Sequence, residues 1–254
     1  MTYYLLGTGG MAHLLASLLS GTDWHCAGVW GRDANRATVL ANALSAPVMG
    51  DLAALTLPVD LILVALADDA IATVVSKLPE TTATLIHFSG TVPIAALQPH
   101  PHRAVCWPVY SIRDGQIPQP SIPAFGESSN PAARQALQSL TKALSWVLYE
   151  GPESTRRQLH LAAVIGNNFI THLLCICEQL CAEHDLPAAV LQPLLYQTFE
   201  RAGSGNPCEA QTGPARRGDR ATQDAHLALL TAHPHWQQLY TAISNSIAEM
   251  YPPQ

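Results

Sequence analysis

The residues with the clearest chemistry lie near the start of the chain, in the run Gly7-Thr8-Gly9-Gly10-Met11-Ala12. This run fits the pattern G-x-G-x-x-G/A, which binds the pyrophosphate of a dinucleotide when it joins a strand to a helix. Gly7 permits a tight turn, Gly9 lets the backbone approach the phosphates, and Ala12 lets the helix pack closely. The helix N-terminus adds unpaired N–H groups and partial positive charge. The sequence therefore predicts a dinucleotide site at Gly7, Thr8, Gly9, Gly10 and Met11.

A second group of chemical interest follows the predicted strand 25–30, where Gly31, Arg32 and Asp33 occur. A guanidinium at this place suits a ribose 2′-phosphate, so Arg32 favours NADP over NAD. Asp33 could repel that phosphate or cap the helix that starts at Ala34, and the helix-forming residues after it favour the cap. The alternative for Arg32 is a solvated surface arginine.

Two further strands, 59–66 and 84–88, should end beside the cofactor. Ligands of parallel α/β sheets bind beyond the carboxyl ends of the strands. We therefore expect the nicotinamide half near five residues, although Asp68 could equally cap a helix. They are Ala65, Leu66, Asp68, Ser89 and Gly90.

His160, Val164 and Asn168 follow i, i+4, i+8 spacing on one long helical pattern, so they share a face. Asn168 could hydrogen-bond a substrate or the nicotinamide amide, and a paired Asn-Asn in mid-helix is unfavourable by propensity, which favours a functional role. His160 could be a general acid or base, since imidazole titrates near neutral pH. A plain surface or bundle histidine is an equal alternative.

A polar loop at 212–219 carries Thr212, Arg216, Arg217 and Asp219. The guanidinium groups could clamp a carboxylate. Alternatively, Asp219 caps the helix that begins near Ala221 and Arg217 pairs with it. The two interpretations are compatible, and we predict a substrate-side role for Thr212 and Arg217.

Strands and helices must position these residues. They alternate up to about residue 150, which predicts a doubly wound parallel α/β sheet. From residue 154 onward the patterns are helical. We therefore predict a dinucleotide-binding domain over residues 1–152 and an all-helical domain over 153–254. Cys175, Cys177 and Cys181 on one helix lack metal-ligand spacing, so no metal site is predicted.

The bulk composition narrows the function classes. The 254 residues carry a formal net charge of −6, which gives no reason to expect nucleic acid binding. No uninterrupted apolar run reaches the roughly 18 residues of a membrane span. The chain begins directly with a strand, so we expect no signal peptide and a cytoplasmic enzyme with reduced thiols.

Five motifs together resemble a known family. They are the glycine run, Ala-Asp-Asp-Ala-Ile at 67–71, His-Phe-Ser-Gly at 87–90, the 160–169 segment and Thr-Gly-Pro-Ala-Arg-Arg-Gly-Asp at 212–219. They look like Rossmann-like proteins with a DUF2520 C-terminal domain, similar in layout to pyrroline-5-carboxylate reductase and the 6-phosphogluconate dehydrogenase superfamily. The resemblance implies an NADP-dependent oxidoreductase, often labelled F420-dependent-like, with a cleft between its domains and dimerisation through the helical one.

Two positions depart from these relatives. Where family members often have His-Pro, this chain has Trp107-Pro108, and where related dehydrogenases have a lysine, it has Val164. Hydride exchange between NADP and a small carbonyl, imine or hydroxy acid remains the favoured interpretation. The alternatives are a non-catalytic dinucleotide-binding or sensor protein and an F420-dependent enzyme. We also predict a homodimer through residues 153–254, because apolar helices on a weakly charged chain leave faces for a partner.

Overall fold

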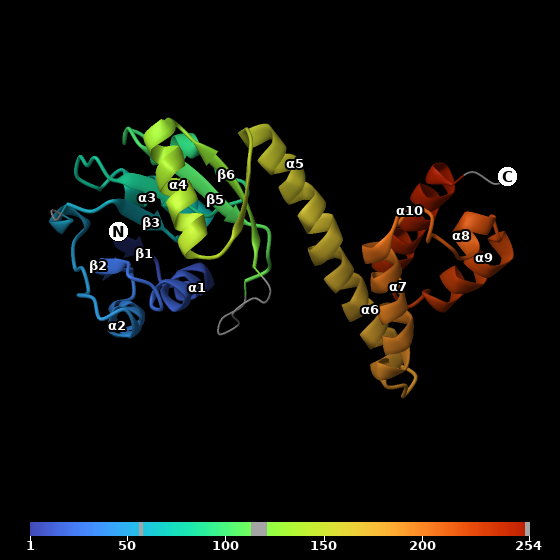
Figure 1. Cartoon of the computed structure of the whole chain (residues 1–254). Coiled ribbons are helices and arrows are strands. Elements are labelled where there is room, and N and C mark those ends of the chain that lie inside the picture. Colours follow the sequence, from blue (N-terminus) through green and yellow to red (C-terminus); the bar gives the residue numbers. More distant parts are fainter. Residues whose placement is uncertain (56–57, 113–120, 252–254) are drawn as a thin grey trace. The chain divides into compact units, whose positions relative to one another are not determined.

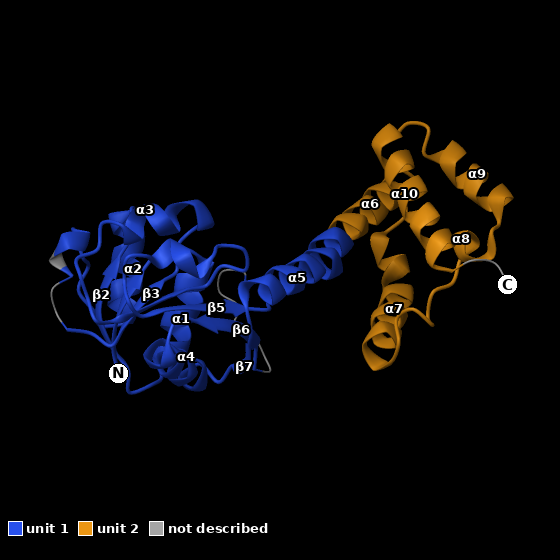
Figure 2. Cartoon of the chain, turned by 90° about the horizontal axis from the view of Figure 1, so that it is seen from above, with its two compact units in different colours: residues 1–171 blue, residues 172–254 orange. Residues whose placement is uncertain are grey.

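The computed structural model describes residues 1–55, 58–112 and 121–251 (Figure 1). Contacts divide the chain into two compact units, Met1–Thr171 and His172–Gln254, here called the first and the second unit (Figure 2). This division falls inside a long helix, whereas the sequence-based boundary between residues 152 and 153 lies at the helix's start. The latter boundary stays a prediction.

The first unit contains a seven-stranded sheet in the order β2-β1-β3-β4-β5-β6-β7. Neighbouring strands are parallel except β5 and β6, which are antiparallel. The predicted α/β class is therefore confirmed, with one antiparallel pair in the sheet that was expected to be wholly parallel. The strands are β1 Thr2–Leu6, β2 His25–Trp30, β3 Leu61–Val64, β4 Thr84–His87, β5 Arg103–Pro108, β6 Pro123–Ser128 and β7 Val147–Glu150.

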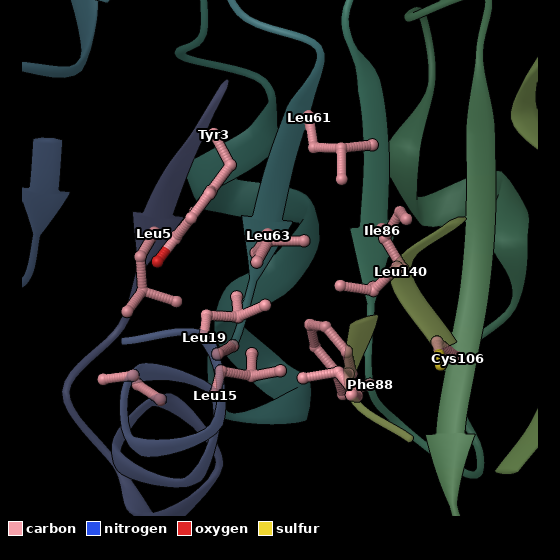
Figure 3. Packing of buried hydrophobic residues seen from close by; sticks show 14 of the residues in the cluster. Tyr3, Leu5, Leu15, Leu19, Leu61, Leu63, Ile86, Phe88, Cys106 and Leu140 are labelled. Carbon is pink, nitrogen blue, oxygen red and sulfur yellow. The ribbon is translucent and has the colours of Figure 1, made fainter. Parts of the chain in front are cut away.

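Helical segments cover the two faces of this sheet. Successive residues of a strand point to opposite faces, so an uninterrupted apolar strand such as β3 fills two cores at once. Leu5 and Leu63 belong to one buried cluster with Leu15 and Leu140, and Figure 3 shows these side chains close together. The helical segments are α1 Gly10–Leu19, α2 Ala34–Ala43, η1 Leu52–Ala54, η2 Asp68–Ala70, α3 Ile71–Val75, η3 Ile94–Leu97, α4 Pro131–Ala143, α5 Glu153–Ala163 and the π-helical η4 Val164–Phe169.

The second unit is helical, as predicted. Its elements are the continuation of α6 Ile170–Ala182, then η5 Ala188–Leu191, α7 Gln192–Ser204, α8 Pro214–Arg217, α9 Arg220–Leu229 and α10 Pro234–Met250. Within its described residues, 172–251, only Ala215, Leu230 and Ser244 are buried. The first unit therefore has a core of its own, whereas the second unit hardly has one.

The continuous helix Glu153–Ala182 is 30 residues long and apolar enough to cross a membrane by length and composition. The core helix of a soluble protein passes the same test, so one such helix is weak grounds for a membrane protein. The sequence prediction had considered only uninterrupted apolar runs, and this helix contains charged residues at its start.

His87 is a fully buried polar residue at the end of β4. Its Nδ1 accepts a hydrogen bond from the backbone N–H of Ser89 at 3.2 Å. Burial and the positive charge of Arg156 lower the pKa of His87 to about 4. The folded protein therefore holds a neutral imidazole at pH values where an unfolded chain, with a histidine pKa of about 6.5, would already bind a proton.

This difference gives the first prediction. The stability associated with neutral His87 is fully present above pH 6.5 and is lost as the pH falls toward 4, because only the unfolded chain takes up the proton. The free energy of unfolding of the wild type, measured by urea denaturation, should fall by about 2 kcal/mol between pH 7 and pH 5 because of this residue. His87→Asn should show a shallower pH dependence by that amount. His25→Asn, at an exposed histidine, should keep the wild-type slope. Identical slopes for wild type and His87→Asn would contradict the prediction.

Candidate functional site

The glycine run forms a tight turn between β1 and α1. Gly7 has a φ of +125°, and a Cβ on it would lie 2.0 Å from the carbonyl oxygen of Ala65. The backbone N–H of Gly7 donates to the carbonyl of Trp30 at 2.8 Å. This turn therefore fits between the ends of β2 and β3 only because residue 7 has no side chain.

The N-terminus of α1 is free to receive an anion. Its N-cap is Gly9, which supplies no side-chain cap, and a Cβ on Gly9 would have nothing within 4 Å. The first N–H groups of a helix have no partners within the helix, and they carry partial positive charge. Open space beside such N–H groups fits the pyrophosphate of a dinucleotide.

The start of α2 lies beside the same loop. Asp33 caps α2 by accepting hydrogen bonds from the N–H groups of Asn35 at 2.9 Å and Arg36 at 3.1 Å, so the predicted capping role is confirmed. Arg36 Nη2 donates to the carbonyl of Thr8 at 2.9 Å. Arg32 is exposed. The segment that follows β2 thus carries two guanidinium groups. The sequence analysis had selected only that of Arg32.

The ends of β3 and β4 are joined by side-chain hydrogen bonds. Asp68 Oδ2 accepts from Thr91 Oγ1 at 2.8 Å. Ser89 Oγ accepts from the N–H groups of Thr91 at 3.1 Å and Val92 at 3.0 Å. Helix η2 begins after Ala67 without a side-chain cap, so Asp68 bonds to the neighbouring turn rather than capping a helix. We call residues 89–92 the β4 turn.

Two aromatic rings lie against the middle of the β4 turn. A Cβ on Gly90 would lie 2.3 Å from Cδ2 of His160 and 3.0 Å from Nε1 of Trp107. The rings of Trp107 and His160 have centroids 5.3 Å apart and planes tilted by 56°. Gly90 therefore allows both rings to touch the backbone at the carboxyl end of β4.

A cavity of about 640 Å³ opens beside these rings. The cavity is lined by the three residues predicted to share a helix face, which are His160, Val164 and Asn168. The other lining residues are Trp107, Val109, Tyr110, Ser111, Ala163, Gly166 and Asn167. An imidazole beside two amides can hydrogen-bond a carbonyl or imine and can move a proton.

The helix changes its geometry where it meets this cavity. Val164–Phe169 is π-helical, with α-helix on both sides. Such segments are rare and occur frequently at functional sites. Asn167 and Asn168 are exposed in it. The pair that is unfavourable in an α-helix therefore occupies an irregular turn at the wall of the cavity.

Thr212 and Arg217 belong to the second unit, and both are exposed there. Thr212 lines an apolar cavity of about 320 Å³ within that unit, and Arg217 ends the short helix α8. Asp219 caps α9 through the N–H of Thr222 at 3.1 Å, as one of the two interpretations expected. A substrate contact by Thr212 or Arg217 stays a prediction.

Sequence reasoning missed Arg156, the largest of the fully buried side chains. Its guanidinium bonds to the β4 turn from the first turns of α5. The only signal in the sequence was an arginine four residues before His160, on the same face of the helix.

Comparison with known proteins shows which family and which solved structures this chain is similar to. Residues 122–247 match the family described as "Domain of unknown function (DUF2520)". A crystal structure from Bacteroides fragilis, named as a candidate NADP oxidoreductase, is 30% identical, with 98% of each chain covered and a TM-score of 0.85. No curated protein matches the sequence.

More distant structures share the fold. The 1-pyrroline-5-carboxylate reductase of Streptococcus pyogenes is 16% identical over 99% of this chain and 98% of its own, with a TM-score of 0.64. A semialdehyde dehydrogenase NAD-binding protein from Cupriavidus necator, in complex with calcium and NAD, is 15% identical over 98% of this chain and 99% of its own, with a TM-score of 0.63. The match over nearly the full length at 30% identity shows that the chain belongs to the family of Rossmann-like proteins with a DUF2520 C-terminal domain.

Proposed function

We propose that the protein is an NADP-dependent oxidoreductase that acts on a small carbonyl, imine or hydroxy-acid substrate. One observation carries the proposal. The cavity with His160, Asn167 and Asn168 is lined by the two rings that lie against the β4 turn. That turn lies at the same edge of the sheet as the glycine turn after β1. A dinucleotide that begins at the N-terminus of α1 has its reactive end near this edge in Rossmann folds.

The cofactor proposal rests on the fit of the first unit to a dinucleotide. Gly7, Thr8, Gly9, Gly10 and Met11 would hold the pyrophosphate. The nicotinamide half would lie beside Ala65, Leu66, Asp68, Ser89 and Gly90. When bound, the cofactor supplies or accepts the hydride, and the protein supplies position and charge. The names of the B. fragilis and C. necator relatives support a nicotinamide dinucleotide in general.

The proposed catalytic groups are His160 and Asn168. His160 would give a proton to, or take one from, the substrate heteroatom, and Asn168 would hydrogen-bond the same region. Related dehydrogenases use a lysine at the place of Val164, and many family members have a histidine at the place of Trp107. Among the described residues that line the cavity, His160 and Tyr110 carry titratable groups. We assign the proton transfer to His160, because histidine is the most common general acid or base.

The second candidate function is a non-catalytic dinucleotide sensor. Val164 and Trp107 favour it, because the groups that commonly do acid or base chemistry in relatives are replaced. An F420-dependent enzyme is disfavoured by Arg32 and Arg36, which suit a ribose phosphate. The cytoplasmic location also stays a prediction.

The cofactor proposal predicts the effect of Arg32→Ala. Loss of a charged hydrogen bond to the 2′-phosphate should weaken NADPH binding by about 1.5–3 kcal/mol, with a much smaller effect on NADH. Isothermal titration with both cofactors measures this difference. Arg157→Ala, at an exposed arginine of α5, is the matched control and should change neither affinity. Equal affinity of the wild type for NADPH and NADH would overturn the preference for NADP.

The catalytic proposal predicts that His160→Gln lowers turnover by about 10²–10⁴-fold, the usual contribution of a general acid or base. Asn168→Ala should also lower turnover. Both variants should keep the wild-type NADPH affinity and melting temperature. The assay follows NADPH oxidation with a panel of carbonyls and cyclic imines, and His184→Gln, at an exposed histidine of the second unit, is the control. A wild type that binds NADPH and oxidises it with no member of the panel would favour the sensor.

We propose in addition that the second unit is covered by a second copy of the chain. A domain of about 60 residues normally buries roughly 60% of the surface of its unfolded chain. The described part of this unit buries three residues, and large apolar side chains such as Tyr196 and Phe199 are exposed. Its apolar cavity is lined by residues of α6, α8, α9 and α10, so helices that should meet around a core leave space between them.

The assembly proposal predicts a mass of twice 27.2 kDa by light scattering at micromolar concentration. Phe199→Glu should weaken the dimer at least about 10-fold, because a charge at an apolar contact costs more than 1.4 kcal/mol. Val39→Glu changes an exposed apolar residue of α2 and should leave the dimer intact. A monomeric wild type, or equal effects of both variants, would count against an interface in the helical region.

A further inference from the structure

Arg156 is a buried cation with three partners. Its side chain is 0% exposed. Nη1 donates to the carbonyl of Ser89 at 3.1 Å, and Nη2 donates to the carbonyl of Val92 at 2.9 Å. Nη2 also lies 3.4 Å from Oε2 of Glu127 on β6. One planar guanidinium therefore bonds to both ends of the β4 turn and to a carboxylate of a distant strand.

The β4 turn is held by its own hydrogen bonds and by those from Arg156. Its own bonds run from the N–H groups of Thr91 and Val92 to Ser89 Oγ, and Ser89 N–H donates to His87. The carbonyls of Ser89 and Val92 accept hydrogen bonds from Arg156. Because a buried carbonyl without a donor costs about 1–3 kcal/mol, these bonds strongly favour one placement of α5 against the turn.

That placement decides where His160 lies. Arg156 and His160 are four residues apart on α5 and therefore share a face of the helix. Between the two carbonyls that Arg156 holds lies Gly90, whose missing side chain leaves room for the rings of His160 and Trp107. A shift of α5 along the turn would move the His160 ring away from its present place against Gly90.

Two titratable groups, Glu127 and His87, interact with the charge of the Arg156 guanidinium. Burial raises the pKa of Glu127, and the charge of Arg156 acts in the opposite direction. The same cation contributes to keeping His87 neutral, so that its Nδ1 remains an acceptor for Ser89 N–H. Arg156 thereby supports the turn through His87 as well as through the two carbonyls, and Glu127 provides the guanidinium with a negative charge.

We infer that Arg156 is a positioning residue, which fixes α5 on the β4 turn and so holds the His160 ring against Gly90 and Trp107. The consequence for catalysis rests on the proposed function, whereas the position of the ring does not. The prediction is that loss of the guanidinium fork displaces His160 while leaving the dinucleotide turn of residues 7–11 intact.

The test uses the proton resonances of the His160 ring in the full-length protein, assigned by their loss in His160→Gln. Protons that lie against an indole are shifted by its ring current, so the packing on Trp107 has a direct signature. Gly90→Ala places a methyl group where Cδ2 of His160 lies and provides the reference for a displaced ring. Arg156→Met should move the His160 resonances toward those of Gly90→Ala.

Two conservative variants separate positioning from general stability. Arg156→Lys keeps the charge but cannot span two carbonyls with a fork, so it should also displace the ring. Glu127→Gln keeps both carbonyl bonds and should leave the His160 resonances at their wild-type positions. If Arg156→Met does not fold, Arg156→Lys decides the matter. Wild-type resonances in Arg156→Lys, together with shifted ones in Gly90→Ala, would overturn the inference.

A kinetic measurement completes the test. With a substrate from the carbonyl and imine panel, Arg156→Lys should lower kcat by about 10²-fold, because small misplacements of a reacting group are costly. NADPH affinity should change much less, because the hydrogen bonds of Arg156 to described residues do not involve the proposed pyrophosphate turn of residues 7–11. A displaced ring with an unchanged kcat would refute the catalytic part of the inference. Absence of turnover in the wild type would instead refute the proposed function, and the resonances would still decide whether Arg156 positions His160.

Discussion

The contact between Gly7 and the carbonyl of Ala65 is the constraint on which the first unit depends. At this place the chain leaves β1 so close to the end of β3 that a Cβ would lie 2.0 Å from an oxygen atom. The close approach lets the chain turn at once into α1, whose apolar residues then cover the sheet (Figure 3). It also leaves the first N–H groups of α1 facing open space. The packing of α1 and the open space at its N-terminus thus follow from one missing side chain.

Much of this arrangement could be predicted because its causes are local. The apolar run of β3, the glycine turn and the cap formed by Asp33 each depend on a few consecutive residues. The shared face of His160, Val164 and Asn168 follows from helical spacing alone, and the structure brings these three residues to one cavity. Val164 and Asn168 lie within the π-helical segment, yet both line the same cavity as His160.

Other features depend on residues far apart in the chain, and these escaped prediction. Arg156 and Arg36 look like ordinary surface arginines in the sequence, because their acceptors are backbone carbonyls, which every residue carries. The antiparallel pairing of β5 with β6 also escaped prediction, because the direction of a strand follows from how the chain returns to the sheet and not from the residues of the strand alone. The sequence of residues 212–219 indicated the cap at Asp219, but it did not indicate the direction of the Arg217 side chain.

The unequal burial of the two units has a consequence for how the chain folds. The first unit buries enough apolar surface to offset the entropy of ordering its own backbone, so its folding is a property of one molecule. Among the described residues of the second unit, only three side chains are buried. If the proposed second copy covers this unit, folding and association of the unit form a single equilibrium governed by mass action. In such a dimer, the order of the C-terminal part would depend on protein concentration, whereas the stability of the N-terminal part, which has a core of its own, would not.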